Sequence, residues 1–333
     1  MKQFCSNSRK RFLIGVVSFL FLVGPGYAQD EDAAKFPSRP VTFIQPFSAG
    51  APADLTIRLI SKEAEKFLGQ PIVVANRPGG SGAIGVAAIA SARPDGYTIG
   101  NAPHSPMFVA PYLQKVPYHP VKDLKMIMQF AAFNMGVSVR SYFSINSFQE
   151  LIEYARRNPK KLTYGTAGAN SMQFIVLEQI AKKEKVQITH VPFKATADSQ
   201  TALLGGHILF AAGDFNYPLI ETKKLKLLIL FREESKEQYP GIPALKDLGY
   251  EFPTPMPMVV AGPRGIPEGI VKKLEEAYTK AIKTPAFVKG MKEDLHLPIV
   301  YRNSQELAEY TAYNYEAYGK MLKEMGLTGT PVE

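Results

Sequence analysis

The spacing of apolar residues predicts strands and helices in regular alternation over the N-terminal third of the chain. A β-branched run ends at Pro46, and apolar side chains then recur at helical spacing, with Asp54 placed as the N-cap of that helix. A helix rich in small residues follows a second strand and stops before Pro94. The predicted elements in this part are 41–45, 53–68, 70–74, 83–92 and 97–100. This succession is typical of a mostly parallel sheet covered by helices.

The rest of the chain repeats the alternation. Ser147 and Glu150 form a capping-box pattern before a helix, and Pro267 is a natural first residue for another. The predicted helices are 151–157, 171–183, 268–283 and 304–325, and the predicted strands are 162–164, 188–191, 208–212 and 225–231. The fold class is therefore α/β, and a length of 333 residues favours two domains.

Residues 1–28 have the pattern of a cleavable secretory signal. A basic N-terminal stretch precedes a twelve-residue apolar run, 12–23, which ends in a Gly-Pro pair. A membrane-spanning helix needs roughly 20 apolar residues, so we expect cleavage rather than a retained anchor. Small residues place the expected cut between Ala28 and Gln29, and we expect the mature protein in the periplasm.

Loss of this leader changes the composition. It removes Cys5, the only cysteine, and with it any disulfide, thiolate nucleophile or cysteine metal site. It also removes four basic residues and no acidic one, which leaves 35 of the 39 Lys and Arg against 30 Asp and Glu. This modest excess suits a small anionic ligand. Aromatic residues are not interleaved with basic ones, so we expect no nucleic-acid partner.

Gly80–Gly85 matches the G-x-G-x-x-G pattern of a dinucleotide-binding turn. It lies in the second strand–helix unit of the mature chain, and no acidic residue follows about 20 positions later to bind a ribose. We therefore interpret it as a tight turn with close helix–strand packing. An exported or intracellular α/β oxidoreductase that uses this turn stays open as an alternative function.

We find no catalytic constellation in the sequence. Gly79–Ala83 departs from the G-x-S-x-G hydrolase elbow at its last position. The five histidines have no metal-ligand spacing, so we predict no metal, and we expect no cofactor. His190 is interpreted as structural, whereas His104 follows a strand and is placed at a ligand cleft.

Two strand-to-helix turns, 45–54 and 164–171, combine small residues, a glycine and hydroxyl or amide groups. Small side chains expose main-chain N–H groups, and the following helix adds the positive end of its dipole. If the two turns face one another from different domains, they can hold a carboxylate from both sides. This favours a binding protein.

These segments resemble the tripartite tricarboxylate transporter receptors, also called the Bug or TctC-type periplasmic solute-binding proteins. The resemblance runs from Phe36 to the last helix and rests on motifs that occur in one order. The motifs are Phe36–Val41, Pro46–Gly50 with Asp54, Asn76–Gly82, Pro94–Thr98, Tyr164–Gly168, His190–Lys194, Leu203–Gly206, Pro240–Pro243 and Gly262–Pro267.

The resemblance implies a two-lobed Venus-flytrap fold of the periplasmic type II kind, with the ligand cleft between the lobes. We place the crossings between lobes near 136–140 and 255–260. The first lobe then comprises 36–137 and the return segment 258–333, and the second lobe comprises 138–257.

The resemblance also implies that main-chain groups of both turns hold a ligand carboxylate, partly through ordered waters. Asp54 is expected to cap its helix rather than to touch ligand. Asp198 stands where the family often has proline, either as a surface helix cap or as a contact to a cationic ligand group. The predicted ligand-binding residues are Phe47, Ser48, Ala49, Gly50, Ala51 and His104 in the first lobe and Thr166, Ala167, Gly168, Asn170, Ser171 and Asp198 in the second.

The implied function is an extracytoplasmic receptor for a small organic carboxylate, whether a di- or tricarboxylate or an aromatic or amino carboxylate. Its implied partners are the large and small integral membrane subunits of a transporter, and we expect a monomer. A receptor that reports its ligand to a two-component sensor is a further alternative. The sequence departs from the family at four positions, Ala51, Phe174, Ala195 and Asp198, and it has no tryptophan. The identity of the ligand therefore stays open.

Overall fold

The computed structural model describes residues 35–327 except 169–170, 216, 233–234 and 237. These residues belong to one compact unit, Asp32–Glu333. The expected signal peptide and its cleavage site lie outside the described residues. Within the described ranges, no helix combines the length and the apolar character that crossing a membrane requires.

The first of two sheets has six strands in the order β11-β4-β10-β3-β1-β2. Strand β1 pairs in parallel with β2 and β3, whereas β10 is antiparallel to β3 and β4. The sheet is mixed rather than mostly parallel, because strands from the last third of the chain enter it in the opposite direction. The strands are β1 (Val41–Gln45), β2 (Ile72–Asn76), β3 (Thr98–Gly100), β4 (Leu124–Ala132), β10 (Pro257–Pro263) and β11 (Ile299–Arg302).

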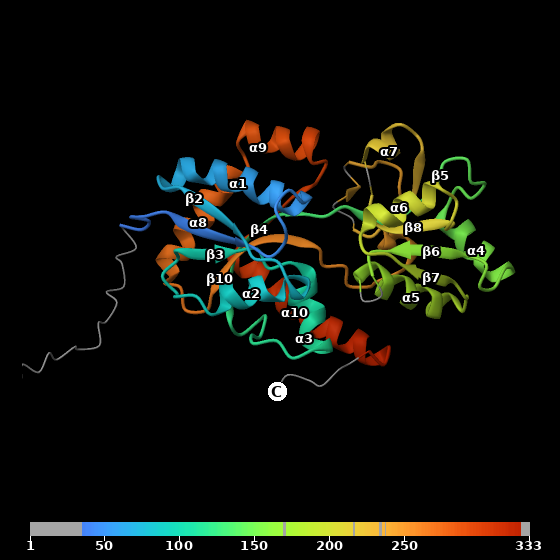
Figure 1. Ribbon diagram of the computed structural model, residues 1–333, viewed down its shortest axis with the longest axis horizontal. Helices are drawn as coiled ribbons and strands as arrows, with labels where there is room; N and C mark the ends of the chain where they lie inside the picture. Colours follow the sequence, from blue (N-terminus) through green and yellow to red (C-terminus); the bar gives the residue numbers. More distant parts are fainter. Residues whose placement is uncertain (1–34, 169–170, 216, 233–234, 237, 328–333) are drawn as a thin grey trace, which may run out of the picture. The chain divides into compact units, whose positions relative to one another are not determined.

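Helices cover both faces of this sheet (Figure 1). Because side chains alternate along a strand, neighbouring residues of β1 enter different cores. Phe43 packs in a core with Ile57 and Tyr278, while Ile44 belongs to a second core with Val86. The helices are α1 (Pro52–Leu68), α2 (Ala83–Ala90), α3 (Ala110–Leu113), α8 (Glu268–Ala281), α9 (Pro285–Lys289) and α10 (Ser304–Glu324).

The second sheet has five strands in the order β7-β6-β8-β5-β9 and is also mixed. Strand β6 is parallel to β7 and β8, and β5 is antiparallel to β8 and β9. The strands are β5 (Met135–Arg140), β6 (Thr163–Thr166), β7 (Thr189–Pro192), β8 (Phe210–Asp214) and β9 (Leu225–Leu230). The helices are α4 (Phe148–Arg157), α5 (Met172–Glu184), α6 (Thr196–Leu204) and α7 (Tyr217–Glu221).

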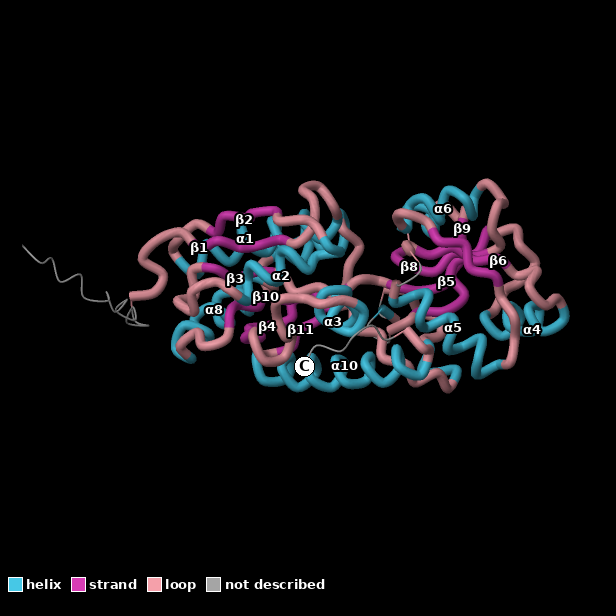
Figure 2. Tube along the Cα trace, turned by 60° about the horizontal axis from the view of Figure 1, so that its bottom comes forward, coloured by secondary structure: helices cyan, strands magenta, loops and turns pink. Residues whose placement is uncertain are grey.

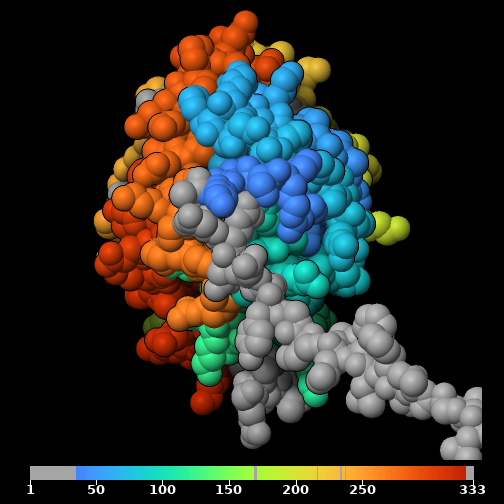
Figure 3. All heavy atoms as spheres, turned by 90° about the vertical axis from the view of Figure 1, so that its left-hand side faces the viewer, coloured from blue at the N-terminus to red at the C-terminus, as the bar shows by residue number. Residues whose placement is uncertain are grey.

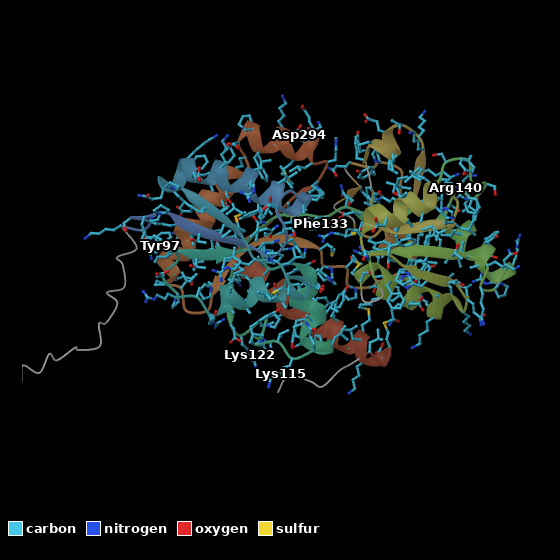
Figure 4. All side chains as sticks on the ribbon, viewed as in Figure 1. Tyr97, Lys115, Lys122, Phe133, Arg140 and Asp294 are labelled. Carbon is cyan, nitrogen blue, oxygen red and sulfur yellow. The ribbon has the colours of Figure 1, made fainter. Side chains whose placement is uncertain are left out.

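The chain passes between the two sheets twice. Phe133 and Asn134 join β4 to β5 and make the first passage, where Figure 4 labels Phe133. The segment 231–256 joins β9 to β10 and makes the second. Residues 136–140, expected near the first passage, lie inside β5. The lobe ranges given above stay predictions.

Distant parts of the chain meet on the first sheet. Lys273 Nζ of α8 donates a hydrogen bond to Phe36 O at 3.0 Å, and α1 packs against α8. Figure 3 shows the blue N-terminal residues beside the orange return segment. Helix α10 packs on β4 and runs from beneath the first sheet toward the second (Figure 2). The C-terminal helices therefore complete the first sheet's layers.

Candidate functional site

One cavity of about 770 Å³ is bordered by loops that follow strands of both sheets. The loop after β1 contributes Phe47, and the loop after β3 contributes His104. The loop after β6 contributes Ala167, Gly168 and Ser171. Strands β1, β3 and β6 each have parallel neighbours, so the cavity lies at carboxyl ends of parallel strands, where α/β sheets commonly bind ligands.

The first turn comprises residues 46–51, and the helix that follows it, α1, begins one residue earlier than predicted. Helix α1 begins at Pro52, and its N-cap is Ala51, which accepts no capping hydrogen bond through its side chain. Asp54 is the third residue of the helix, so the prediction that it is the N-cap is wrong. Proline has no N–H to leave unpaired and its fixed φ suits a first helical position, which explains the earlier start.

Asp54 holds the first turn through its carboxylate. Its Oδ2 accepts hydrogen bonds from the Gly50 N–H and from Arg58 Nε, both at 2.9 Å. Its Oδ1 accepts one from Asn76 Nδ2 at 2.8 Å, and the same amide donates to Phe47 O at 2.8 Å. Gly50 has φ +82°, a conformation that glycine adopts without strain. The turn is therefore tied to both β2 and α1.

These contacts keep Asp54 ionised and leave other groups of the turn free. Burial by itself raises the pKa of Asp54, but the hydrogen bonds outweigh it and lower the pKa below 3.8. Across the described chain, no backbone acceptor pairs with the N–H groups of Ser48 and Ala49. Unpaired N–H groups ahead of a helix can bind an anion.

The second turn, residues 166–171, is held by Thr166. Its Oγ1 donates to Gly168 O at 2.9 Å and lies 2.8 Å from His190 Nε2. A hydroxyl has one proton to donate, so His190 Nε2 must be the donor toward Thr166. Gly168 has φ +102°, and a Cβ built there would have no neighbour within 4 Å. Its backbone thus requires glycine, while the space above it is open.

Helix α5 begins directly after this turn. Ser171 is its N-cap, and its Oγ accepts the Phe174 N–H at 3.3 Å. Met172 and Gln173, the first two helical residues, border the cavity. The positive end of the α5 dipole is therefore directed at the cavity.

The predicted ligand-binding residues divide into those that border the cavity and those that do not. Asp198 is exposed near the start of α6 and is not part of the cavity lining. Thr166 is fully buried beneath the second turn, and Asn170 lies outside the described residues. Phe47, His104, Ala167, Gly168 and Ser171 border the cavity, and Ser48, Ala49, Gly50 and Ala51 belong to the first turn beside Phe47.

His104 lies in the cavity wall and is 7% exposed. Its ring packs edge-on against Tyr318, with 5.0 Å between ring centroids, and beside Phe108. Burial lowers its pKa to about 3, so the imidazole is neutral at physiological pH. Its Nε2 has no partner among the described residues. A neutral imidazole nitrogen can donate or accept one hydrogen bond, according to its tautomer.

The glycine-rich turn Gly80–Gly85 is explained by close packing. A Cβ at Gly85 would lie 2.8 Å from Pro46 Cα, nearer than side chains approach a backbone. Gly82 has φ +97°, and Ser81, with φ +54°, borders the cavity. These glycines let α2 approach the first turn and so support its position, in agreement with the packing interpretation.

Other residues of the cavity have no counterpart in the sequence prediction. Phe133 comes from the first passage between sheets, and Met256 from the second. Gln173 is 5% exposed, and its Nε2 lies 3.3 Å from Met135 Sδ. Asp214 is the last residue of β8 and the one carboxylate of the described lining. No local sequence signal distinguishes these residues, because they reach the cavity from different parts of the fold: Phe133 and Met256 from the passages between sheets, Gln173 from the start of α5, and Asp214 through sheet pairing.

Comparison with known proteins supplies the family context. Residues 56–327 match the family described as "Tripartite tricarboxylate transporter family receptor". A curated relative, the "UPF0065 protein in gbd 5'region" of Cupriavidus necator, is 34% identical over 304 residues, which are 91% of each chain.

Two solved structures with bound ligands are similar throughout. MatC (Rpa3494) from Rhodopseudomonas palustris with bound malate is 27% identical, with a TM-score of 0.69, and the match covers 86% of this chain and 100% of that one. R. palustris Rpa4515 with adipate is 25% identical, with a TM-score of 0.73, over 88% of this chain and 99% of that one. The two mixed sheets flanked by helices thus match two-lobed periplasmic binding proteins.

Proposed function

The chain belongs to the tripartite tricarboxylate transporter receptor family, and on this premise we propose that it binds a small organic carboxylate in the cavity between its two turns. The ligand carboxylate is held by main-chain N–H groups that the two turns leave unpaired among the described residues, such as those of Ser48 and Ala49 in the first turn and of Ala167 and Gly168 in the second. The receptor then delivers its ligand from the periplasm to the large and small integral subunits of a membrane transporter.

One observation carries this proposal: the first turn and the second turn, which come from different sheets, border the same cavity. Each turn precedes a helix, so we expect the positive ends of α1 and α5 and main-chain N–H groups of both turns to act on an anion in this cavity. No lysine or arginine belongs to the described cavity lining. Main-chain groups are therefore the natural ligands for an anion here.

Closure of the lobes is the proposed mechanism. The two passages between the sheets, at Phe133–Asn134 and within 231–256, are the segments that can absorb a rotation. A carboxylate that bridges both turns favours the closed arrangement, because each turn alone leaves part of the anion unpaired. The malate and adipate bound by the two similar receptors are the reason to test dicarboxylates early.

Thermal unfolding in the presence of candidate ligands tests the proposal. A ligand that binds only the native state adds about 2.7 kcal/mol of stability at a concentration of 100 Kd. We expect a rise in melting temperature with one or more small carboxylates and none with neutral sugars of similar size. Stabilisation by NAD but by no carboxylate would favour the oxidoreductase alternative and refute the receptor proposal.

A further inference from the structure

Asp214 presents an unpaired carboxylate to the cavity. Its backbone is fixed, because it pairs with Met135 in the β5–β8 ladder and its carbonyl oxygen accepts Gln200 Nε2 at 2.6 Å. The residue borders the cavity together with Ala167 and Gly168 of the second turn. No hydrogen bond or ion pair joins its carboxylate to any described side chain.

No positively charged side chain of the described lining neutralises the carboxylate of Asp214. His104 is the other titratable residue of the described lining, and burial keeps it neutral. Tyr239, packed nearby between Phe215 and Tyr217, has its pKa raised by burial and further by Tyr217 and Asp214, and is also neutral. Burial raises the pKa of Asp214 itself to about 7, which is the expected response of a carboxylate that has lost water without gaining a cation.

This arrangement conflicts with a ligand that carries two carboxylates. If one carboxylate occupies the two turns, a second one that approaches Asp214 meets another carboxylate, and no basic side chain of the described lining offsets the repulsion. A cationic nitrogen at the same place would pair with Asp214 and restore its ionised form. Asp198, the acidic residue that the sequence suggested for such a contact, is exposed outside the cavity.

We propose that Asp214 is a specificity-determining residue that binds a cationic nitrogen of the ligand, so that the receptor prefers amino carboxylates to dicarboxylates of the same length. This inference rests on the proposed function, since it takes the two turns as the carboxylate site. The ligand is then a zwitterion, with its carboxylate at the turns and its ammonium group at the end of β8.

Isothermal titration calorimetry with matched ligand pairs tests this inference. Suitable pairs are γ-aminobutyrate with succinate, δ-aminovalerate with glutarate, ε-aminocaproate with adipate, and α-amino acids with their α-hydroxy analogues. We expect at least one amino carboxylate to bind tenfold or more tightly than its partner. Asp214→Asn, which keeps the shape but removes the charge, should lower that affinity at least tenfold. Asp198→Asn is the matched control and should leave it unchanged.

The pH dependence gives a second, independent readout. An ammonium group needs ionised Asp214, so affinity for the amino carboxylate should rise with pH up to about 7 and fall by up to about tenfold per unit below it. The opposite trend, with a dicarboxylate bound more tightly at lower pH and Asp214→Asn binding it as well as the parent, would mean that protonated Asp214 donates to a second carboxylate. That result would overturn the inference.

The outcomes also separate this inference from the proposed function. Carboxylate binding that shows no preference within any pair, and no response to Asp214→Asn, refutes the role of Asp214 and leaves the receptor function standing. Binding of neither class, by a protein that unfolds cooperatively, refutes the proposed function and the role of Asp214 with it.

Discussion

The Gly50 N–H donates a hydrogen bond to Asp54 Oδ2 at 2.9 Å, which ties the turn after β1 to the first turn of α1. Asp54 is 1% exposed and accepts from Arg58 and Asn76 as well. One buried carboxylate therefore fixes three separate segments beside the cavity. It acts on the shape of the site without bordering it.

Replacing Asp54 should destabilise the protein. Asp54→Ala removes a charged acceptor and takes from the Gly50 N–H its acceptor and from the Asn76 amide one of its two, so we expect the free energy of unfolding to fall by about 2 kcal/mol. Urea unfolding at neutral pH measures this loss. The exposed Asp294 (labelled in Figure 4) provides the control, since Asp294→Ala should change stability by less than about 0.5 kcal/mol. Equal losses in the two variants would contradict the role given to Asp54.

The contribution of Asp54 should disappear in acid. Its folded-state pKa is lower than the ordinary 3.8, so the ionised form is favoured by folding. Its stabilising effect is therefore complete above that value and is lost as pH falls through the lower folded-state pKa. The stability gap between the parent and Asp54→Asn should be full at neutral pH and shrink below about pH 4. A gap that stays constant into acid would exclude this electrostatic origin.

Gly168 should be needed for binding more than for folding. With φ +102°, Gly168→Ala must change the backbone of the second turn at a cost of about 1–2 kcal/mol. We expect ligand affinity to fall more than tenfold, because the N–H groups of the turn lose their alignment. Gly249→Ala is the matched control: Gly249 has φ +76°, no neighbour within 4 Å of a built Cβ, and no place in the cavity lining. The Gly249→Ala variant should bind ligand with the affinity of the parent, although its backbone is strained in a similar way.

His104 should make stability depend on pH in a defined window. The pKa of His104 is about 3 in the folded protein, whereas in the unfolded chain it is about 6.5. The free energy of unfolding is therefore not reduced by His104 above pH 6.5, and it falls as the pH decreases from 6.5 toward 3. Between pH 7 and pH 5 the parent should lose about 2 kcal/mol more than His104→Phe. Chemical denaturation at both pH values measures the difference. Parallel losses would show that His104 is accessible to protons in the folded state.

Gly85 should tolerate no side chain. The Cβ of Gly85→Ala meets Pro46 Cα at 2.8 Å, so α2 must move and we expect a loss of about 1–3 kcal/mol in stability. The melting temperature of this variant, with and without NAD, tests both interpretations of the glycine pattern. NAD should stabilise neither the parent nor the variant. An unchanged melting temperature in the variant would contradict the packing explanation.

Much of the fold follows from local sequence patterns. Short strands bounded by turns, such as β1 and β6, alternate with amphipathic helices and were predicted close to their final bounds. Strands β4, β5 and β10 were not, because they are buried on both faces and show no alternation that marks a strand. In the first sheet β10 and β11 run opposite to the other strands, and in the second sheet β5 does, so the sheets expected to be mostly parallel are mixed.

The site was predictable where it depends on backbone conformation. Glycine and small residues before a helix mark both turns, and Gly168 and Phe47 border the cavity, while their expected contact with ligand stays a prediction. Asp214 was missed because nothing near it in the sequence sets it apart from any acidic residue at the end of a strand. Its position depends on the β5–β8 pairing, which joins residues far apart along the chain.

A crystal structure of the protein with a carboxylate that raises its melting temperature tests the central claim. We predict that the ligand lies in the cavity, with its carboxylate oxygens within hydrogen-bonding distance of main-chain N–H groups from both the first turn and the second turn. A ligand bound away from these turns, or one whose carboxylate is held by a lysine or arginine side chain, would contradict it.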